Sequence, residues 1–234
     1  MKKLTILCSA FIILLSSCHF TTGSGNIVTE KRSVSNFSGI DASTSIDVEV
    51  KIGPAEEIRV EADDNVIKHV VTSVSDGVLK IKIENLHMIN DVHVKIYVTT
   101  PRLESVKASA SASVKVLDVI KGSGKLSFEA TSSADIVAEV DAPEIEAEVN
   151  SAGSLTLSGK TKNYKAEASS SGDIMSSQLL SENADVDASS SGSIDVYASV
   201  SLDAKASSSG DIVYHGAAAV KQSVSSSGSV EKKD

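Results

Sequence analysis

Apolar and polar residues alternate along most of the chain after residue 26, a pattern that predicts β-strands with one buried face. Segment 46–52, for example, reads Ile-Asp-Val-Glu-Val-Lys-Ile. Segments 70–75 and 78–83 flank Asp76-Gly77, a pair that favours the tight turn of a β-hairpin. No stretch in this region has the 3.6-residue period of an amphipathic helix. The pattern therefore predicts an all-β protein.

In the second half, the alternation is organised into repeats of 18–22 residues. The clearest copies read SSSGDI at 169–174, SSSGSI at 189–194, SSSGDI at 207–212 and SSSGSV at 225–230. Three weaker copies precede them. The fourth residue of each copy serves as a marker, and the seven markers are Ala112, Ala134, Gly153, Gly172, Gly192, Gly210 and Gly228. Such regular spacing is the mark of a repeat architecture.

Positions counted from the marker keep their character in every copy. The residue two places after it is aliphatic: Val114, Ile136, Leu155, Ile174, Ile194, Ile212 and Val230. The residue four places before it is small: Ala108, Ala130, Val149, Ala168, Ala188, Ala206 and Val224. Serine fills the position two before the marker in six copies, and we interpret this column as a ladder of interior hydroxyls.

The regular spacing of the copies, together with one buried face in each, predicts that they stack as a single-chain β-helix, or β-solenoid, over residues 106–230. Each coil would hold two or three short strands paired in parallel with the next coil, at a rise of ~4.8 Å. Parallel crossovers are right-handed, so we expect a right-handed coil. The alternative interpretation, a disordered Ser/Gly/Ala-rich segment, does not account for the aliphatic column.

Aspartate occurs one place after the marker in alternate copies, as Asp135, Asp173 and Asp211, with serine in between. Stacking would separate these carboxylates by ~9.6 Å, twice the strand spacing, which weakens their repulsion. We interpret the ladder chiefly as a solvated face that limits like-charge contact. A shallow Ca²⁺ or sugar site, or a catalytic carboxylate pair, remains an alternative.

Residues 1–17 are expected to be a lipoprotein signal peptide. Lys2 and Lys3 precede the apolar segment 4–15, which is too short to span a bilayer. Leu15-Ser16-Ser17-Cys18 resembles the bacterial lipobox, which implies lipid attachment at Cys18, palmitate-type acylation and a tether over 18–25. The alternative is an ordinary signal peptide with an incidental cysteine. Removing Cys8 with the leader would leave no disulfide.

The composition of the chain limits the classes of partner that we expect it to bind. The formal charge is −9 and aromatic residues make up 3% of the chain. Binding to nucleic acid needs a concentrated basic surface, so we expect no nucleic-acid partner. Of the five histidines, His87 and His93 could approach each other across a turn, but no third ligand is evident, and we expect no metal and no cofactor. Residues 231–234 form a charged tail that would either protect the last strand edge or fray.

Residues 23–53, 58–85 and 92–114 together resemble the family called putative auto-transporter adhesin, head GIN domain. The matching pieces include Phe37, Gly53, Glu61-Ala62-Asp63, Asp76-Gly77 and Pro101. The resemblance covers residues 23–215, and it implies a β-helix-like protein of the Gram-negative envelope, often a lipoprotein. It brings no catalytic motif.

Together these observations predict a less regular strand-rich part over 26–105 before the solenoid. They predict a non-enzymatic, lipid-anchored outer-membrane protein, with its periplasmic or surface face undecided. It would bind a glycan or an envelope or host surface protein through many shallow contacts. A polysaccharide-active enzyme and a structural or stress-related envelope component are the alternatives.

Overall fold

The computed structural model describes residues 21–86 and 89–233. Within this range the protein is built almost wholly of β-strands, with one short 3₁₀ turn, η2 (Ile67–His69). The expected signal peptide, Cys18, His19 and His87 lie outside the described residues. The fold prediction of an all-β solenoid is confirmed.

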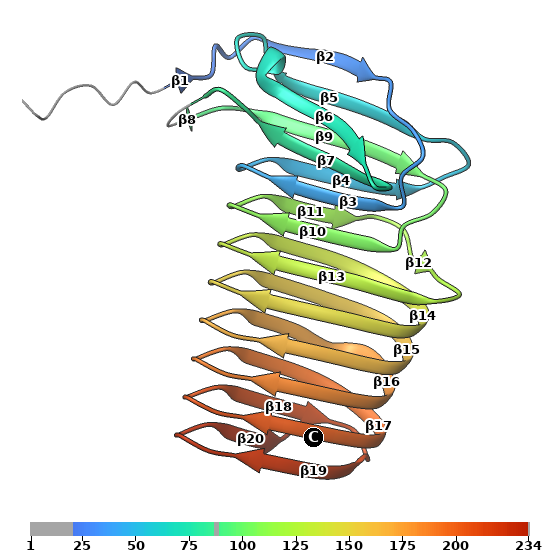
Figure 1. The fold of residues 1–234 in the computed structure, drawn as a ribbon, viewed down its shortest axis with the longest axis vertical. Coiled ribbons are helices and arrows are strands. Elements are labelled where there is room, and N and C mark those ends of the chain that lie inside the picture. Colours follow the sequence, from blue (N-terminus) through green and yellow to red (C-terminus); the bar gives the residue numbers. More distant parts are fainter. Residues whose placement is uncertain (1–20, 87–88, 234) are drawn as a thin grey trace, which may run out of the picture.

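The strands form a tall stack of flattened coils, each with two layers (Figure 1). One layer contains the strand segments that follow the repeat turn, and the other those that precede it. We call them the post-turn layer and the pre-turn layer. The strands of the stack are β10 (Ser105–Ser109), β11 (Ser113–Val116), β12 (Ile120–Lys121), β13 (Lys125–Thr131), β14 (Asp135–Asn150), β15 (Ser154–Ala168), β16 (Asp173–Ala188), β17 (Ser193–Ala206), β18 (Asp211–His215), β19 (Ala219–Val224) and β20 (Ser229–Lys232).

Neighbouring coils pair in parallel and in the register of the sequence repeat. Ile136 pairs with Leu155, and Ile174 pairs with Ile194. In the other layer, Ala168 pairs with Ala188. Equivalent positions of successive copies therefore stand directly above one another, which is what the repeat spacing predicted.

Both predicted core columns face the interior. From Val114 to Ile212, the aliphatic column is no more than 1% exposed, and from Ala108 to Ala206 so is the small column. Small side chains in the pre-turn layer let the two layers approach closely, so aliphatic side chains from the post-turn layer fill the space between them. The last copy departs from this pattern, because Val224 is 47% exposed.

The serine-rich segment is a tight turn at one edge of the stack. In all seven copies, the two residues before the marker have positive φ, as at Ser170 (51°) and Ser171 (63°). The Gly172 amide donates to the Ser169 carbonyl at 2.9 Å and closes the turn. Two left-handed residues closed in this way give a type I′ turn.

The predicted ladder of interior serine hydroxyls is therefore wrong. Ser170, Ser190 and Ser208 are exposed at the turn edge. Their backbone groups form the ladder instead: the Ser171 amide donates to Ser190 O at 3.1 Å, and the Ser191 amide to Ser208 O at 3.1 Å. The column keeps a small polar residue because its backbone is left-handed and its side chain meets water.

At the opposite edge the chain bends within continuous strands, so the central coils contain strands of 14–16 residues rather than two or three short ones. The pairing of β16 with β15 and β17 shifts register near this bend. Gly159 lies at this bend with φ of +109°. Pro143 also lies at this bend, inside β14, where Ala142 and Glu144 pair with β15 but Pro143 does not. A proline cannot donate a backbone hydrogen bond, and it is tolerated there because this position is not paired with the next strand.

The N-terminal half adds a further coil and then a cap. The strands of this half are β1 (Thr21–Thr22), β2 (Ile27–Arg32), β3 (Gly39–Ser43), β4 (Asp47–Ile52), β5 (Glu57–Asp63), β6 (Val70–Ser75), β7 (Val78–Ile83), β8 (Ile89–Asn90) and β9 (Val94–Thr100). β3 and β4 stack in register on β10 and β11, and β7 and β9 stack on β3 and β4.

Antiparallel strands then close this end of the stack. β6 pairs with β7 in the predicted hairpin, and β5 pairs with both β9 and β2 (Figure 1). Asp63 of β5 is 2% exposed and holds two loops in place. Its carboxylate accepts hydrogen bonds from the amides of Gly25 at 2.7 Å and His93 at 2.8 Å.

Candidate binding faces

The predicted Asp/Ser ladder runs along the outer face of the post-turn layer, beside the turns. The register places Asp135 beside Ser154, Ser154 beside Asp173, and Ser193 beside Asp211. Carboxylates thus stand two strand spacings apart, ~9.6 Å along the stack. The ladder continues upward to Asp47, which pairs with Ser113. At its lower end, the Ser229 hydroxyl donates to the Asp211 carboxylate.

Serine between two aspartates leaves this ladder with few direct charge contacts. Asp135 and Asp211 are exposed and Asp173 is half-buried. The arrangement can offer hydroxyl and carboxylate groups in alternation to a ligand that lies along the stack.

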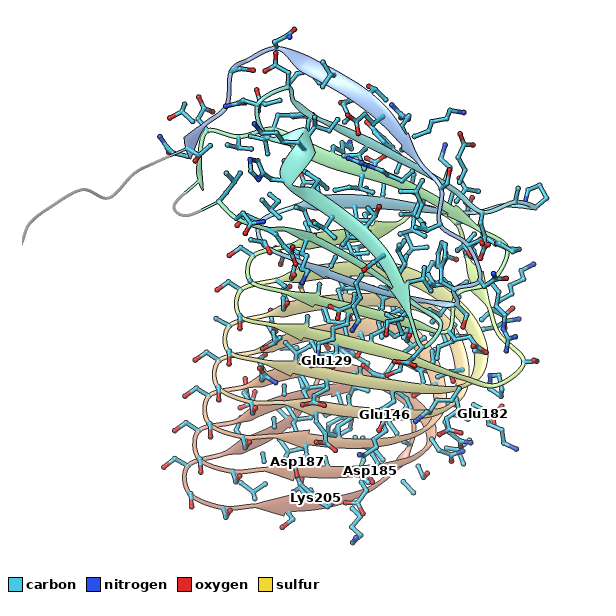
Figure 2. The ribbon with its side chains drawn as sticks, turned by 45° about the horizontal axis from the view of Figure 1, so that its top comes forward. Glu129, Glu146, Glu182, Asp185, Asp187 and Lys205 are labelled. Carbon is cyan, nitrogen blue, oxygen red and sulfur yellow. The ribbon has the colours of Figure 1, made fainter. Side chains whose placement is uncertain are left out.

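A second column of carboxylates, on the outer face of the pre-turn layer, has no such spacing. Glu129 pairs with Glu148, Glu148 with Glu167, and Glu167 with Asp187. Lys107 stands above the four acids and Lys205 below them. We call Glu129, Glu148, Glu167 and Asp187 the acidic column. Figure 2 shows its first and last members, Glu129 and Asp187, on one face of the stack.

Stacking four carboxylates at successive strand spacings has an electrostatic cost. Two unit charges ~4.8 Å apart in water repel by roughly 0.9 kcal/mol, before screening by salt. Lys107 offsets the charge of Glu129, with its Nζ 2.7 Å from Oε1, and Lys165 that of Glu167 at 2.6 Å. Among the described residues, Glu148 and Asp187 form no salt bridge. The column therefore concentrates negative charge on a solvent-exposed strip.

Beside the acidic column, lysines join one coil to the next. Lys125 Nζ lies 2.6 Å from Glu146, and Lys221 Nζ lies 2.6 Å from Asp203. The hydrogen bond and charge of Lys125 lower the pKa of Glu146, with a smaller contribution from Lys165. The hydrogen bond from Lys221 lowers the pKa of Asp203 in the same way.

An open groove of about 500 Å³ runs across these coils. Asn163, Asn183 and Ser201 form a hydrogen-bonded row along it: Asn183 Nδ2 donates to Asn163 Oδ1 at 3.2 Å, and Ser201 Oγ donates to Asn183 Oδ1 at 2.8 Å. Glu144, Asp185 and Asp203 also line the groove. It can accept a polar ligand by hydrogen bonding on an open surface.

Two of the described histidines, His93 and His215, are partners of acids. His93 Nε2 lies 3.1 Å from Glu61, and His215 Nε2 lies 2.9 Å from Asp195. The approach of His87 to His93 lies partly outside the described residues. In residues 21–86 and 89–233, no three His, Cys, Asp or Glu side chains gather as a metal site would require. In the same range, no helix has the length and apolar character needed to cross a bilayer.

The acidic column and the place of Asp47 on the ladder were not predicted, although both leave a signal in the sequence. The acidic column occupies the position five before the marker, which could have been aligned like the others. Segment 43–48 reads Ser-Thr-Ser-Ile-Asp-Val, a copy of the repeat with isoleucine at the marker. It was hidden because 66 residues separate Ile46 from Ala112, and the cap strands occupy most of that interval.

These features define the class of protein: a β-solenoid that is capped at one end and carries extended polar columns on its outer faces. The chain belongs to the family described as putative auto-transporter adhesin, head GIN domain, whose model matches residues 36–218. The resemblance drawn from the sequence is thus confirmed.

Solved structures of low sequence identity share this fold. A putative adhesin from Bacteroides fragilis is 19% identical with a TM-score of 0.82, covering 91% of this chain and 98% of its own. A putative adhesin from Parabacteroides merdae is 22% identical with a TM-score of 0.71, covering 92% and 99%. A putative lipid binding protein from Parabacteroides distasonis is 24% identical with a TM-score of 0.75, covering 92% and 100%. No curated protein matches the chain.

Proposed function

We propose that this protein is a non-enzymatic binding protein of the bacterial envelope, anchored by lipid at Cys18 and acting as an adhesin. The observation that carries the proposal is the register of the stack. Because each coil repeats the same outward positions, one side-chain type is presented at intervals of ~4.8 Å along a face. Weak contacts repeated at a fixed interval give a combined affinity much greater than that of one contact.

Charge selects the acidic column as the first face to test. Four successive carboxylates, two of them without a salt bridge in the described structure, fit a partner with cationic groups along an extended chain. The partner would be a basic segment of an envelope or host surface protein, or an amino-bearing glycan. The Asp/Ser ladder of Asp135, Asp173 and Asp211 is the second face, and its alternating hydroxyls suit a neutral glycan.

The family name and the named adhesins among the structural relatives support binding rather than catalysis. The carboxylates of the acidic column and of the Asp/Ser ladder lie on open sheet faces, whereas hydrolysis of a polysaccharide needs two carboxyl groups set around the scissile bond. Turnover of a polysaccharide by the purified protein would contradict the proposal.

Anchoring at Cys18 would hold the cap close to the membrane. Only two residues separate Cys18 from Thr21, whose strand β1 pairs with β8 beside the cap. At ~3.5 Å per extended residue, the lipidated cysteine would lie within roughly 10 Å of the folded protein. More than one acyl chain gives durable attachment. The outer faces would then stand upright from the bilayer.

Two matched triple variants test the binding face. Glu148→Gln/Glu167→Gln/Asp187→Asn removes three charges from the acidic column, and Asp135→Asn/Asp173→Asn/Asp211→Asn removes three from the ladder. Binding of the full chain to a glycan array and to polylysine is measured for both. We expect polylysine binding to fall at least tenfold in the first variant only. Equal binding by both variants and the wild type would contradict a role for either face.

The anchor has its own test. Cys18→Ala is expected to abolish labelling of the full chain by a clickable fatty acid and to release the protein from the membrane fraction. Cys8→Ser is the matched control, since it lies in the expected leader and should leave labelling unchanged. Labelling that survives Cys18→Ala would overturn the anchor.

A further inference from the structure

The two ends of the stack differ in how their last strands are covered. At the N-terminal end, β5 and β2 pair with β9, and β6 pairs with β7. At the other end, β19 pairs with β17 along one edge. Its second edge has no partner in the described chain (Figure 1), so the backbone amides and carbonyls along that edge have no strand to pair with. An uncovered parallel-sheet edge is a template for another strand.

In the last coil, side chains at positions that are buried in the other coils are exposed to solvent. All six residues of β19 are exposed, whereas its neighbour β17 buries Leu202, Ala204 and Ala206 at the paired positions. Val220 is 37% exposed and Val224 is 47% exposed. These side chains point in the direction of the core but lack a covering coil, which leaves apolar area in water.

We propose that this edge pairs with the same edge of a second copy, tail to tail and antiparallel, centred on Gln222. The interior-facing positions of β19 read Val220-Gln222-Val224, and this order is the same in both directions. A twofold axis through Gln222 would place Val220 opposite the second copy's Val224, on both sides of a Gln222–Gln222 pair. Such self-complementarity is what an isologous interface requires.

Gln222 supports this choice of partner over an unrelated strand. Its column is otherwise apolar, occupied by Val106, Phe128, Ala147, Ala166, Val186 and Ala204. An amide in the position of a core residue is costly unless it is hydrogen-bonded. Facing its own copy, the Gln222 amide can donate to the second amide and accept from it.

The outward charges of β19 allow the same pairing. In this register, Lys221 stands opposite the second copy's Ser223, so no like charges face each other. Lys221 is already paired with Asp203 at 2.6 Å within its own chain. Lysines on edge strands ordinarily discourage strand addition, but here the charge is directed to the outer face and neutralised.

Tail-to-tail pairing has a consequence that rests on the proposed function. The two caps would lie at opposite ends of the dimer, with the anchored Cys18 residues pointing away from each other. Two copies could then join two membranes, and a copy in one bilayer would not pair with its neighbour in the same bilayer. A second copy of this chain would then be one binding partner of the proposed adhesin.

Cysteine cross-linking of the mature protein, purified in detergent, tests the register. Opposed residues of antiparallel strands have Cβ atoms about 5 Å apart, which a disulfide can span. Gln222→Cys should therefore form a covalent dimer under mild oxidation. In Val220→Cys, the two cysteines would lie about 14 Å apart, four residues along the strand, and should not link. The double variant Val220→Cys/Val224→Cys should link again.

The expected result is a yield of linked dimer at least tenfold higher for Gln222→Cys than for Val220→Cys. Equal yields, or no dimer from Gln222→Cys, would overturn the pairing. Circular dichroism checks the fold of each variant, and these exposed positions leave little risk of unfolding. Wild-type protein is oxidised in parallel as a control. A wild-type dimer would reveal a free Cys18 thiol and contradict the anchor. The difference in yield between Gln222→Cys and Val220→Cys would still test the pairing of the edge.

Discussion

The repeat coils and the N-terminal cap both cover the apolar interior of the stack, but they do so with different contacts. In the repeat coils, similar small and aliphatic side chains stand in columns, and each coil is covered by a near copy of itself. In the cap, antiparallel strands of unlike sequence close the stack, and one buried carboxylate, Asp63, holds two loops. The stack therefore rests on many equivalent contacts, whereas the cap rests on a few that have no replacement.

This difference determines how far the effect of a destabilising substitution extends through the molecule. A solenoid coil contacts chiefly its two neighbours, so its stability is close to a sum of local contributions. A defect in one coil can be tolerated by the others. Loss of a unique contact in the cap would leave the first coil without its covering strands. We therefore expect a larger loss of unfolding free energy for a substitution in the cap.

The largest effect is expected for Asp63→Ala in the cap. The substitution leaves the amides of Gly25 and His93 without their acceptor, and we expect a loss of about 2–4 kcal/mol of unfolding free energy. Urea denaturation measures it. Asp64→Ala is the matched control, because Asp64 is exposed and its carboxylate accepts hydrogen bonds from the side chains of Ser24 and Asn26. Equal losses in the two variants would show that burial of Asp63 does not matter.

Gly159→Ala should be next, within a coil. A Cβ there would lie 2.0 Å from the Val140 carbonyl oxygen, and φ of +109° is disallowed for alanine. We expect a loss of about 2–3 kcal/mol, with faster hydrogen exchange confined to β14, β15 and β16. Gly124→Ala is the control, since no atom lies within 4 Å of its added Cβ. Fast exchange throughout the molecule would contradict local stability.

A smaller effect of opposite sign is expected at a repeat turn. Ser170→Asn/Ser171→Gly gives the residues that a type I′ turn prefers, and we expect a gain of about 1 kcal/mol. Thermal denaturation measures the gain. Ser169→Gly is the control, because Ser169 does not have positive φ and should gain nothing. A loss of stability in the double variant would show that the serine side chains stabilise the turn.

The smallest effect concerns acid stability of the cross-coil ion pairs. The pKa of Glu146 is lowered in the folded state by Lys125, so its contribution is present above the unfolded pKa and is lost as pH falls through the folded one. Glu146→Gln should therefore reduce stability at pH 7 but not at pH 2, and should reduce the slope of stability against pH below about pH 4.5. An unchanged slope would contradict a stabilising role for this pair.

Much of the coil could be predicted from the sequence because burial repeats there. The columns from Val114 to Ile212 and from Ala108 to Ala206 were assigned to the core, and the structure confirms both. Serine was placed inside because alternation alone cannot distinguish a buried strand position from a left-handed turn residue. The two positive φ angles of each turn, as at Ser170 and Ser171, interrupt the alternation without leaving a hydrophobic signal.

The cap could be predicted only as strands. Its hairpin was found from Asp76-Gly77, but the order of the layers was not. β3 and β4 precede β7 and β9 in the chain, yet lie between them and β10 and β11 in space. No repeat spacing reports such an arrangement. The acidic column was overlooked for a different reason, since charged exterior residues vary more between copies than core residues do.

Equivalent positions of successive coils stand in register, one strand spacing apart. Spin labels at Asp41 and Asp187, and at Asp41 and Ser223, test it by electron-electron double resonance. Asp41 pairs with Lys107 and Ser223 with Lys205, so both labels lie on the outward column that contains the acidic column. Five strand spacings from Asp41 to Asp187 and seven from Asp41 to Ser223 give separations of about 24 Å and about 34 Å. We expect distances that grow by about 5 Å per coil, whatever the number of residues between the labels. Distances that instead follow sequence separation, or broad distributions without a peak, would contradict it.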